Sequence, residues 1–228
     1  MKTTVLVLAL AACGGGSTDI DATMVFADRS DQEIARLISA ASGTDMFGAQ
    51  GAVDRFAGEA DPCPAVSASG ASITLTGDCT TMDGILIEGT ARVTNPTAWD
   101  QVDYTFGDDT VYELTGWSLT LSSFTQVFDG NVRIESFTVW DADVTATQLG
   151  IEVRSDLHYD CDSATCDLDG SGVEIVGIGG ATVSGTVQLN GEANASFRLR
   201  GRDTLNASIS QGCVAWAIEG TDRQKTCP

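Results

Sequence analysis

Apolar residues with helical spacing first appear after Ser30. Ser30 and Glu33 have the spacing of a capping box, in which each side chain binds a free backbone N–H of the first helical turn. The apolar positions that follow share one helical face: Ile34, Leu37, Ile38 and Ala41. We expect an amphipathic helix that ends near Gly43, because glycine readily takes the left-handed conformation that closes a helix. A second, short helical turn is expected over residues 52–56.

From Pro62 onward the apolar positions alternate, which places every second side chain on one buried face of a strand. The alternating sets are Ile73 and Leu75; Ala91 and Val93; Val102, Tyr104 and Phe106; Trp117, Leu119 and Leu121; Leu157 and Tyr159; Val183, Val187 and Leu189; Phe197 and Leu199; and Val214, Trp216 and Ile218. Turn-forming pairs separate the strands: Asp83-Gly84, Asp129-Gly130, Asp169-Gly170, Gly179-Gly180 and Asn190-Gly191. Because short turns join antiparallel neighbours, we predict a mainly all-β fold, an antiparallel β-meander with one short N-terminal helix.

Glycines also recur inside the expected strands, at Gly89, Gly116, Gly185 and Gly220. Glycine in a strand interior commonly marks a bulge or bend. Repeated bends favour a strongly curved sheet, a barrel or a half-barrel that the N-terminal helix covers or plugs. A β-sandwich is the alternative architecture.

The N-terminus has the pattern of an export signal. One positive side chain, Lys2, precedes an uncharged apolar run from Val5 to Ala12. Eight residues of helix rise only about 12 Å, too little for a hydrocarbon core of roughly 30 Å. Leu10-Ala11-Ala12-Cys13 resembles the lipobox of bacterial lipoproteins. This resemblance, confined to the N-terminal segment, implies cleavage before Cys13 and attachment of lipid to its sulfur.

The lipobox and the composition after it define the expected organisation of the chain. Residues 1–12 are expected to be a signal peptide, 13–27 the lipidated Cys13 with a flexible linker, 28–60 a helical segment, and 61–228 the β domain. In the Gram-negative lipoproteins that the lipobox resembles, aspartate after the cysteine favours the inner membrane. Gly14 therefore implies an outer-membrane protein of the cell envelope, anchored by palmitate-type acyl chains and not spanning the bilayer.

Seven cysteines are an odd number, and lipidation of Cys13 leaves six that can pair. These six disulfide candidates are Cys63, Cys79, Cys161, Cys166, Cys213 and Cys227. Three disulfides agree with export to an oxidising compartment. Six cysteines allow about fifteen connectivities, and we favour pairing of sequence neighbours.

Acidic residues dominate the charge, with 32 Asp and Glu against 12 Lys and Arg and a net charge of −20. Such a surface repels nucleic acid, so we expect no nucleic-acid partner. The membrane is the expected partner, through the lipid anchor, and any protein or small-molecule partner is left open. Much of the charge is aspartate, a common turn former, so part of it follows from loop chemistry.

One polar segment suggests a metal ion. Asp167, Asp169 and Ser171 occupy the first, third and fifth positions of an EF-hand-type loop, with Gly172 at the sixth, which makes calcium a candidate cofactor. The twelfth position is Ile178 instead of the usual bidentate glutamate. The alternative is a disulfide-closed hairpin rich in turn-forming aspartate. No other cofactor is implied.

No catalytic motif accompanies these features. The single histidine, His158, is out of phase with the apolar positions around it and is expected to face solvent, and no Gly-x-Ser-x-Gly elbow is present. The sequence therefore favours a non-enzymatic binding or structural domain anchored in the envelope. The alternatives are a carrier of lipid or another hydrophobic ligand, similar in architecture to half-barrel periplasmic carriers, and, last, a carboxylate- or metal-dependent surface hydrolase.

Overall fold

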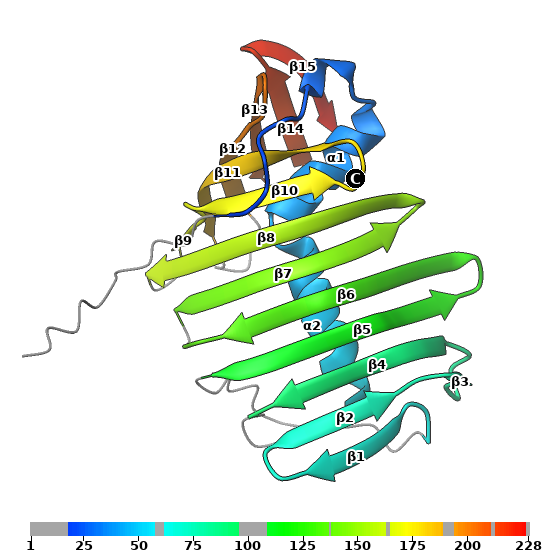
Figure 1. The fold of residues 1–228 in the computed structure, drawn as a ribbon. Helices are drawn as coiled ribbons and strands as arrows, with labels where there is room; N and C mark the ends of the chain where they lie inside the picture. The colour runs from blue at the N-terminus through cyan, green and yellow to red at the C-terminus, as the bar shows by residue number, and fades with distance from the viewer. Residues whose placement is uncertain are drawn as a thin grey trace, which may run out of the picture.

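A long antiparallel sheet curves around two helices in this protein (Figure 1). The computed structural model describes residues 18–57, 62–95, 109–136, 138–162, 165–188, 194–210 and 213–226, with side chains up to Thr221. A 3-10 turn, η1 (Phe26–Asp28), leads into the helices α1 (Asp31–Ala41) and α2 (Thr44–Ala57). The prediction of a mainly all-β antiparallel fold with an N-terminal helix is confirmed.

Helix α1 begins with the capping box that the sequence predicted. The Ser30 hydroxyl accepts a hydrogen bond from the backbone N–H of Glu33, and the Glu33 carboxylate accepts one of 2.8 Å from the N–H of Ser30. The helix buries its apolar face, and full burial of each large side chain contributes about 2 kcal/mol. Gly43 follows the helix with a φ of +78°, as expected for a residue that closes it.

Helix α2 is longer than the short turn expected over residues 52–56. It contains Gly48 and Gly51, and glycine costs about 1 kcal/mol relative to alanine in a helix interior, so the helical pattern of this segment is weak. A Cβ at position 48 would lie 3.5 Å from the ring of Phe128 in the sheet. This is an ordinary van der Waals distance, so α2 packs directly on the sheet at this position, and such packing offsets its low helix propensity.

The strands follow one another along the sheet in nearly the order of the chain. They are β1 (Ala65–Ser69), β2 (Ser72–Thr76), β3 (Cys79–Thr80), β4 (Leu86–Thr94), β5 (Thr110–Leu121), β6 (Phe124–Ile134), β7 (Val139–Gln148), β8 (Ile151–Asp162), β9 (Thr165–Asp167), β10 (Ser171–Ile175), β11 (Gly179–Gln188), β12 (Asn194–Arg200), β13 (Thr204–Ser210), β14 (Cys213–Ile218) and β15 (Thr221–Thr226). The short strand β3 pairs with β4, and β9 pairs with β8 and β11. All neighbouring strands are antiparallel, as in a meander.

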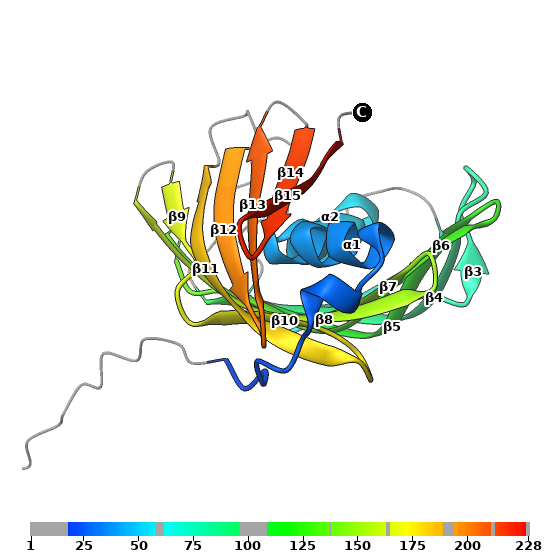
Figure 2. The ribbon, with the colours of Figure 1, turned by 90° about the horizontal axis from the view of Figure 1, so that it is seen from above.

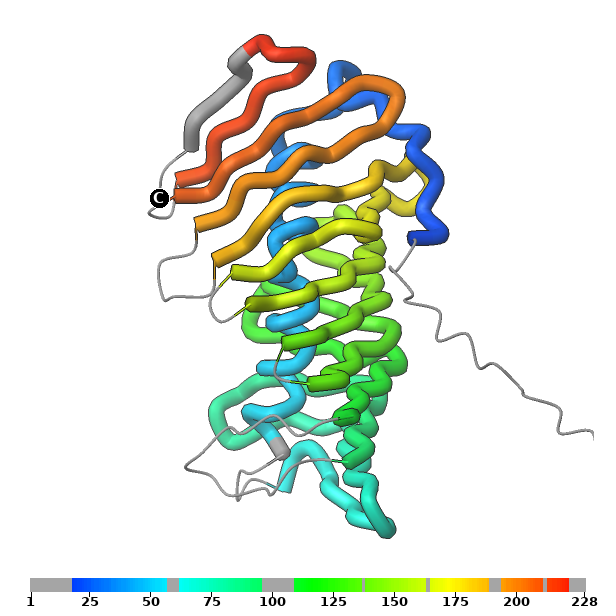
Figure 3. Tube along the Cα trace, turned by 90° about the vertical axis from the view of Figure 1, so that its left-hand side faces the viewer, coloured from blue at the N-terminus to red at the C-terminus, as the bar shows by residue number. Residues whose placement is uncertain are grey.

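The sheet forms a trough that holds the helices along its length (Figures 2 and 3). Helix α1 packs against β8 and β10, and α2 packs against β6 and β7. The strand order runs from β1 to β15, and the described residues form no pairing between these two end strands. The sheet is thus curved and open, and all strands belong to one sheet instead of the two of the alternative β-sandwich.

Alternation along β8 shows how the sequence specifies the two faces of the sheet. Val153, Leu157 and Tyr159 are buried on the concave face against the helices, whereas Arg154 and His158 lie on the convex face and are partly exposed. A one-residue slip in register would place this entire apolar set in solvent. The predicted burial of Leu157 and Tyr159 is confirmed.

Two of the recurring glycines interrupt the regular pairing, as predicted. The register shifts around Gly89 in the β4–β5 pair and around Gly116 in the β5–β6 pair. Gly89 has a φ of +81°, and a Cβ there would collide with the backbone of Gly116. The Asp129 carboxylate accepts a hydrogen bond of 2.6 Å from the N–H of Gly116, which satisfies a donor beside the bulge.

The other two glycines differ from the prediction. Gly185 keeps regular pairing with Phe197, although its φ is +139° and a Cβ there would collide with the neighbouring strand. Gly220 lies in the turn between β14 and β15 instead of inside a strand. Neither of these two glycines therefore interrupts the regular pairing of the strands.

The predicted turns are only partly confirmed. Asp83-Gly84 and Asp169-Gly170 lie in turns. Asp129-Gly130 lies within β6, because Asp129 serves the bulge described above, and Gly179-Gly180 begins β11 after a turn at residues 176–178. Asn190-Gly191, Leu189 and the strand expected over residues 102–106 lie outside the described residues.

Candidate functional site

The N-terminal segment crosses the convex face of the sheet before it reaches the helices. The backbone N–H of Thr18 donates a hydrogen bond of 2.8 Å to the carbonyl of Gly170, and Ala22 forms a parallel bridge with Gly180. Asp19 lies 3.0 Å from the guanidinium of Arg154. We call residues 18–25 the strap. It falls in the region expected to be flexible linker, yet it is packed on the fold.

Glycines in the sheet make room for the strap. A Cβ at Gly172 would collide with the Thr18 hydroxyl, and one at Gly180 would collide with the side chain of Ile20. A Cβ at Gly201 would collide with the backbone of Met24. Ile20 and Met24 are both buried. The strap therefore lies in a groove that only glycine leaves open.

Asp203 fixes the point where the strap turns from the convex face into the trough. Its carboxylate accepts hydrogen bonds of 2.7 Å from the N–H of Phe26 and 2.9 Å from the N–H of Ala27, at the start of η1. A carboxylate is well suited to this position, because the free N–H groups of a helical turn point at it. Phe26 is fully buried beneath it.

The chain leaves the fold toward Cys13 at an acidic end of the sheet. Thr18 is bonded beside the β9–β10 turn, and four exposed aspartates surround the turns at this end: Asp160, Asp162, Asp167 and Asp169. Cys13 itself lies outside the described residues. The described part of the chain therefore begins at this end of the sheet.

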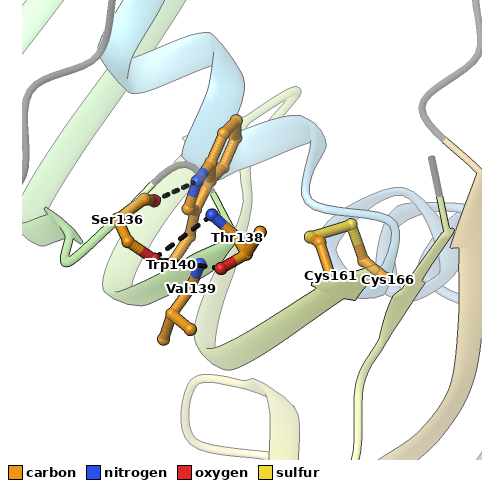
Figure 4. Close-up of a disulfide and its surroundings, with 6 residues drawn as sticks. All are labelled: Ser136, Thr138, Val139, Trp140, Cys161 and Cys166. Carbon is orange, nitrogen blue, oxygen red and sulfur yellow. Dashed lines mark hydrogen bonds between the residues drawn. A yellow bond between two sulfur atoms is a disulfide. The ribbon is translucent and has the colours of Figure 1, made fainter. Parts of the chain in front are cut away.

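Two disulfides join sequence neighbours, as predicted. Cys63 bonds to Cys79, and Cys161 bonds to Cys166. Cys213 is also disulfide-bonded, while Cys227 lies outside the described residues. The second bridge closes β8 onto β9 beside the β6–β7 turn (Figure 4).

Ser136 organises the β6–β7 turn. Its hydroxyl accepts a hydrogen bond from the N–H of Val139, and its carbonyl accepts one of 3.1 Å from the indole N–H of Trp140 (Figure 4). The N–H of Cys161 donates to the carbonyl of Thr138, which ties this turn to the bridged strand. The disulfide and the turn together reinforce the acidic end.

The three residues considered for calcium do not have equivalent surroundings. Asp167 and Asp169 are exposed, whereas Ser171 is fully buried. The Ser171 hydroxyl accepts a hydrogen bond of 2.8 Å from the N–H of His158 and donates to the carbonyl of the same residue. This hydroxyl therefore holds β10 against β8. Within the described ranges, no three His, Cys, Asp or Glu side chains lie close enough to share a metal ion, and calcium binding stays a prediction.

His158 lies on the convex face, as its phase predicted. Its Nδ1 lies 2.6 Å from Oδ1 of Asp141, and 24% of its side chain is exposed. Asp141 is directly opposite on β7. This cross-strand pair stabilises the outer surface and contacts neither the trough nor the helices.

A buried ion pair joins the two helices at the bend between them, residues 42–43, which we call the elbow. Nη2 of Arg36 on α1 lies 2.8 Å from Oδ2 of Asp45 on α2, and both side chains are almost completely buried. The same Nη2 donates a hydrogen bond of 3.1 Å to the carbonyl of Ala146 on β7. Burial raises the pKa of Asp45, and Arg36 opposes that shift. The pair fixes the angle of the elbow and its position on the sheet.

Tyr159 lies beside this pair, under the elbow. A Cβ on Gly43 would collide with its hydroxyl, and this hydroxyl has no hydrogen-bond partner among the described residues. Burial, together with the negative charge of Asp45, raises the pKa of Tyr159 well above its ordinary value. The phenol is thus neutral and acts as part of the core, next to Phe47 and Trp140.

A second polar cluster lies further along α2. The Tyr112 hydroxyl donates a hydrogen bond of 2.9 Å to Oδ1 of Asp54, and the amide of Gln50 donates one of 3.4 Å to Oδ2. Burial raises the pKa of Asp54, while these two hydrogen bonds lower it. The pKa of Tyr112 is also raised, by burial and by the charge of Asp54. The cluster ties the middle of α2 to β5.

These interior groups were not predicted from the sequence. Nothing in the sequence indicates that Arg36 and Asp45 face one another across the turn between the two helices. Both clusters connect helix to sheet. No described helix is long and apolar enough to cross a membrane.

Comparisons with protein-family models, curated proteins and solved structures gave no match to this chain.

Proposed function

We propose that the protein is a lipid-anchored component of the bacterial cell envelope, with acyl chains on Cys13 and a non-enzymatic binding or structural β domain. The order of a charged residue, an apolar run, small residues and Cys13 supports the anchor. The observation that carries the proposal is the strap, which is packed from Thr18 onward. Thr18 is five positions after Cys13, so the folded domain stays within about 18 Å of its anchor.

The interior supports a domain without catalytic chemistry. The two buried polar clusters are engaged between helix and sheet, and the apolar side chains of the trough pack into one core with those of α1 and α2. Binding would then take place on the outer surface. The outer membrane is the location we propose, from Gly14 after the cysteine.

Metabolic labelling tests the anchor. The full chain, produced in a Gram-negative host supplied with radioactive palmitate, is expected to incorporate label and to fractionate with the outer membrane. The Cys13→Ser variant should carry no label and leave the membrane fraction, whereas Ser17→Ala, a matched change in the same segment, should behave as the unaltered chain. Equal labelling of Cys13→Ser, or no label on the unaltered chain, would refute lipidation at this cysteine.

A carrier of lipid or another hydrophobic ligand is the second candidate, favoured by the trough shape of the sheet. The concave face is covered by α1 and α2, whose apolar residues pack against it. A ligand would have to displace these helices, breaking the contacts of Arg36 with Asp45 and Ala146. Native mass spectrometry of the protein extracted from membranes distinguishes the two functions, because a carrier would retain a lipid-sized mass in addition to the acyl chains.

A further inference from the structure

Charge is distributed unevenly along the chain. From β12 onward, residues 194–228 contain five Lys and Arg against three Asp and Glu, which gives a net charge of +2. Residues 13–193 contain six Lys and Arg against 29 Asp and Glu, which gives a net charge of −23. The last strands are therefore weakly basic in a strongly acidic protein, and such an asymmetry indicates a surface with an anionic partner.

Three exposed arginines follow one another in this region: Arg198 and Arg200 on β12, and Arg202 in the turn after it. We call them the arginine patch. Each of the six earlier arginines lies within 4.0 Å of a carboxylate oxygen. The arginines of the patch have no carboxylate partner among the described residues. Their guanidinium groups are therefore available to an external anion, which arginine binds through two parallel hydrogen bonds.

Two carboxylates close to the patch are used by the fold. The Asp203 carboxylate, directly after Arg202, accepts two backbone N–H groups at the start of η1. The Glu219 carboxylate accepts a hydrogen bond of 2.7 Å from the backbone N–H of Thr204. Both carboxylates thus satisfy backbone donors instead of pairing with the arginines, which explains how unpaired arginines persist in an acidic protein.

The two arginines on β12 lie on the convex face of the sheet, since Phe197 and Leu199 alternate with them and are buried on the other face. Figure 2 shows β11–β14 as one wall of the trough, with the helices on its inner side. Arg198 and Arg200 are two positions apart on one strand, so their backbones are about 7 Å apart. Nε of Arg198 donates a hydrogen bond of 3.2 Å to Oδ1 of Asn206 on β13. This bond orients the guanidinium and leaves its two Nη groups for a ligand.

Hydroxyl and amide side chains surround these two arginines on the convex face. The neighbouring positions on β11, β12 and β13 are all at least partly exposed: Thr182, Ser184, Ser196, Thr204, Asn206 and Ser208. None of these six side chains is acidic or aromatic. Hydroxyl and amide groups can both donate and accept hydrogen bonds, as the hydroxyls of sugars do, whereas nucleic-acid bases stack on aromatic side chains. The surface therefore fits a ligand that carries both negative charge and sugar hydroxyls.

We propose that the arginine patch binds an acidic polysaccharide, whose carboxylates pair with the guanidinium groups. The inference rests on the proposed function of a binding domain and names the ligand class. On β11, Thr186 pairs with Asp167 at the acidic end, whereas Thr182 pairs with Arg200 further along the strand. The patch thus extends away from the acidic end, and at about 0.1 M salt charges more than about 10 Å away are largely screened. A polyanion can therefore bind the patch although the chain as a whole is acidic.

Titration calorimetry with polygalacturonate, a polymer of carboxylated sugars, tests the proposal on the full chain in a nonionic detergent. Arg198→Gln and Arg200→Gln are each expected to weaken binding about tenfold, because each removes a charge-assisted contact. Both variants should unfold at the temperature of the parent chain, since the two side chains are exposed. Arg92→Gln is the matched control: Arg92 is also exposed on the sheet but is paired with Glu113, so this variant should bind as the parent does.

Two further polymers separate the possible partners of the patch. Dextran, an uncharged polymer of sugars, and poly-L-glutamate, which carries carboxylates on a peptide, should both bind more weakly than polygalacturonate. Poly-L-glutamate that binds as tightly, and is lost in the same variants, assigns the patch to an acidic protein and overturns the proposal. No binding of polygalacturonate by the parent, or equal binding by Arg198→Gln and Arg200→Gln, also overturns it. Palmitate labelling of Cys13 does not involve these arginines, so failure of the patch is distinguishable from failure of the anchor.

Discussion

Two opposing effects, burial and hydrogen bonding, act on the pKa of the Asp54 carboxyl. Burial raises its pKa above the ordinary value of 3.8, and the bonds from Tyr112 and Gln50 lower it only in part. The folded chain therefore retains this proton to a higher pH than the unfolded chain does. Stability linked to Asp54 is present at low pH and is lost as the pH rises through the interval between its unfolded and folded pKa values.

Asp54→Asn isolates this effect. The variant lacks the titration, so the free energy of unfolding of the unaltered chain minus that of the variant should decrease as the pH rises above 3.8, measured by urea denaturation at several pH values. Tyr112→Phe removes the stronger of the two hydrogen bonds and should shift the decrease to higher pH. A difference that is constant with pH, or that grows, would contradict the raised pKa.

The buried pair of Arg36 and Asp45 illustrates what one residue can contribute to architecture. Removing one partner of a buried pair leaves an uncompensated charge, at a cost of about 3–5 kcal/mol, although a well-packed apolar substitute for both partners is often as stable. The benefit of the pair is therefore specificity: it connects α1, α2 and β7 at one point. It is also the contact that a carrier function would have to break.

At the scale of elements, the glycines of the helical segment have opposite roles. Gly51 is exposed within α2, and a Cβ there would meet no neighbouring atom within 4 Å. Gly43 lies at the elbow with a φ of +78°, where a Cβ would collide with the Tyr159 hydroxyl and approach the Phe47 ring to 3.1 Å.

Alanine at each position should separate these roles. Gly51→Ala is expected to stabilise the fold by about 1 kcal/mol, the difference in helix propensity. Gly43→Ala is expected to destabilise it by more than about 1 kcal/mol, because alanine is strained in the left-handed conformation and meets the tyrosine. Urea denaturation of the two variants measures both values, and a destabilised Gly51→Ala would show that α2 depends on that glycine.

Elements governed by local pattern were predictable from the sequence, and those governed by distant packing were not. The capping box, the end of α1 and the alternation of β8 depend on neighbours within a few residues. Helix α2 was underestimated because Gly48 and Gly51 lower its helix propensity, whereas its packing on β6 and β7 involves residues far along the chain. Asp129-Gly130 was misread as a turn because Asp129 binds the N–H of Gly116 on another strand. In both cases the residue types were read correctly, but their partners were not visible in the sequence.

For the whole molecule, Asp203 joins the ends of the fold. Its carboxylate receives the N–H groups of Phe26 and Ala27, which are 177 and 176 residues away along the chain. Asp203→Ala should lower the free energy of unfolding by about 3 kcal/mol, because two hydrogen bonds to a charged acceptor are lost. Urea denaturation provides the measurement.

Asp160 on β8 is exposed and serves as the control for Asp203. Asp160→Ala should change the free energy of unfolding by less than about 0.5 kcal/mol. If both variants behaved alike, Asp203 would not be what holds the N-terminal segment.

The candidate sites also differ in whether local sequence or distant packing defines them. Cys13 and the pairing of sequence neighbours follow from local sequence, and the pairing is confirmed for two bridges. The strap has neither helical nor alternating spacing, and its groove is made by Gly172, Gly180 and Gly201 on different strands.

The strap also has a consequence for the order in which the fold is completed. Its partners lie more than 130 residues downstream, and α1 packs against strands β8 and β10 that follow it by more than 100 residues. Contacts of such long sequence separation form slowly. During export the N-terminal segment would emerge and become tethered while its groove does not yet exist. Folding then ends with the intramolecular capture of the strap by its groove, at an effective concentration that is set by the length of chain between them.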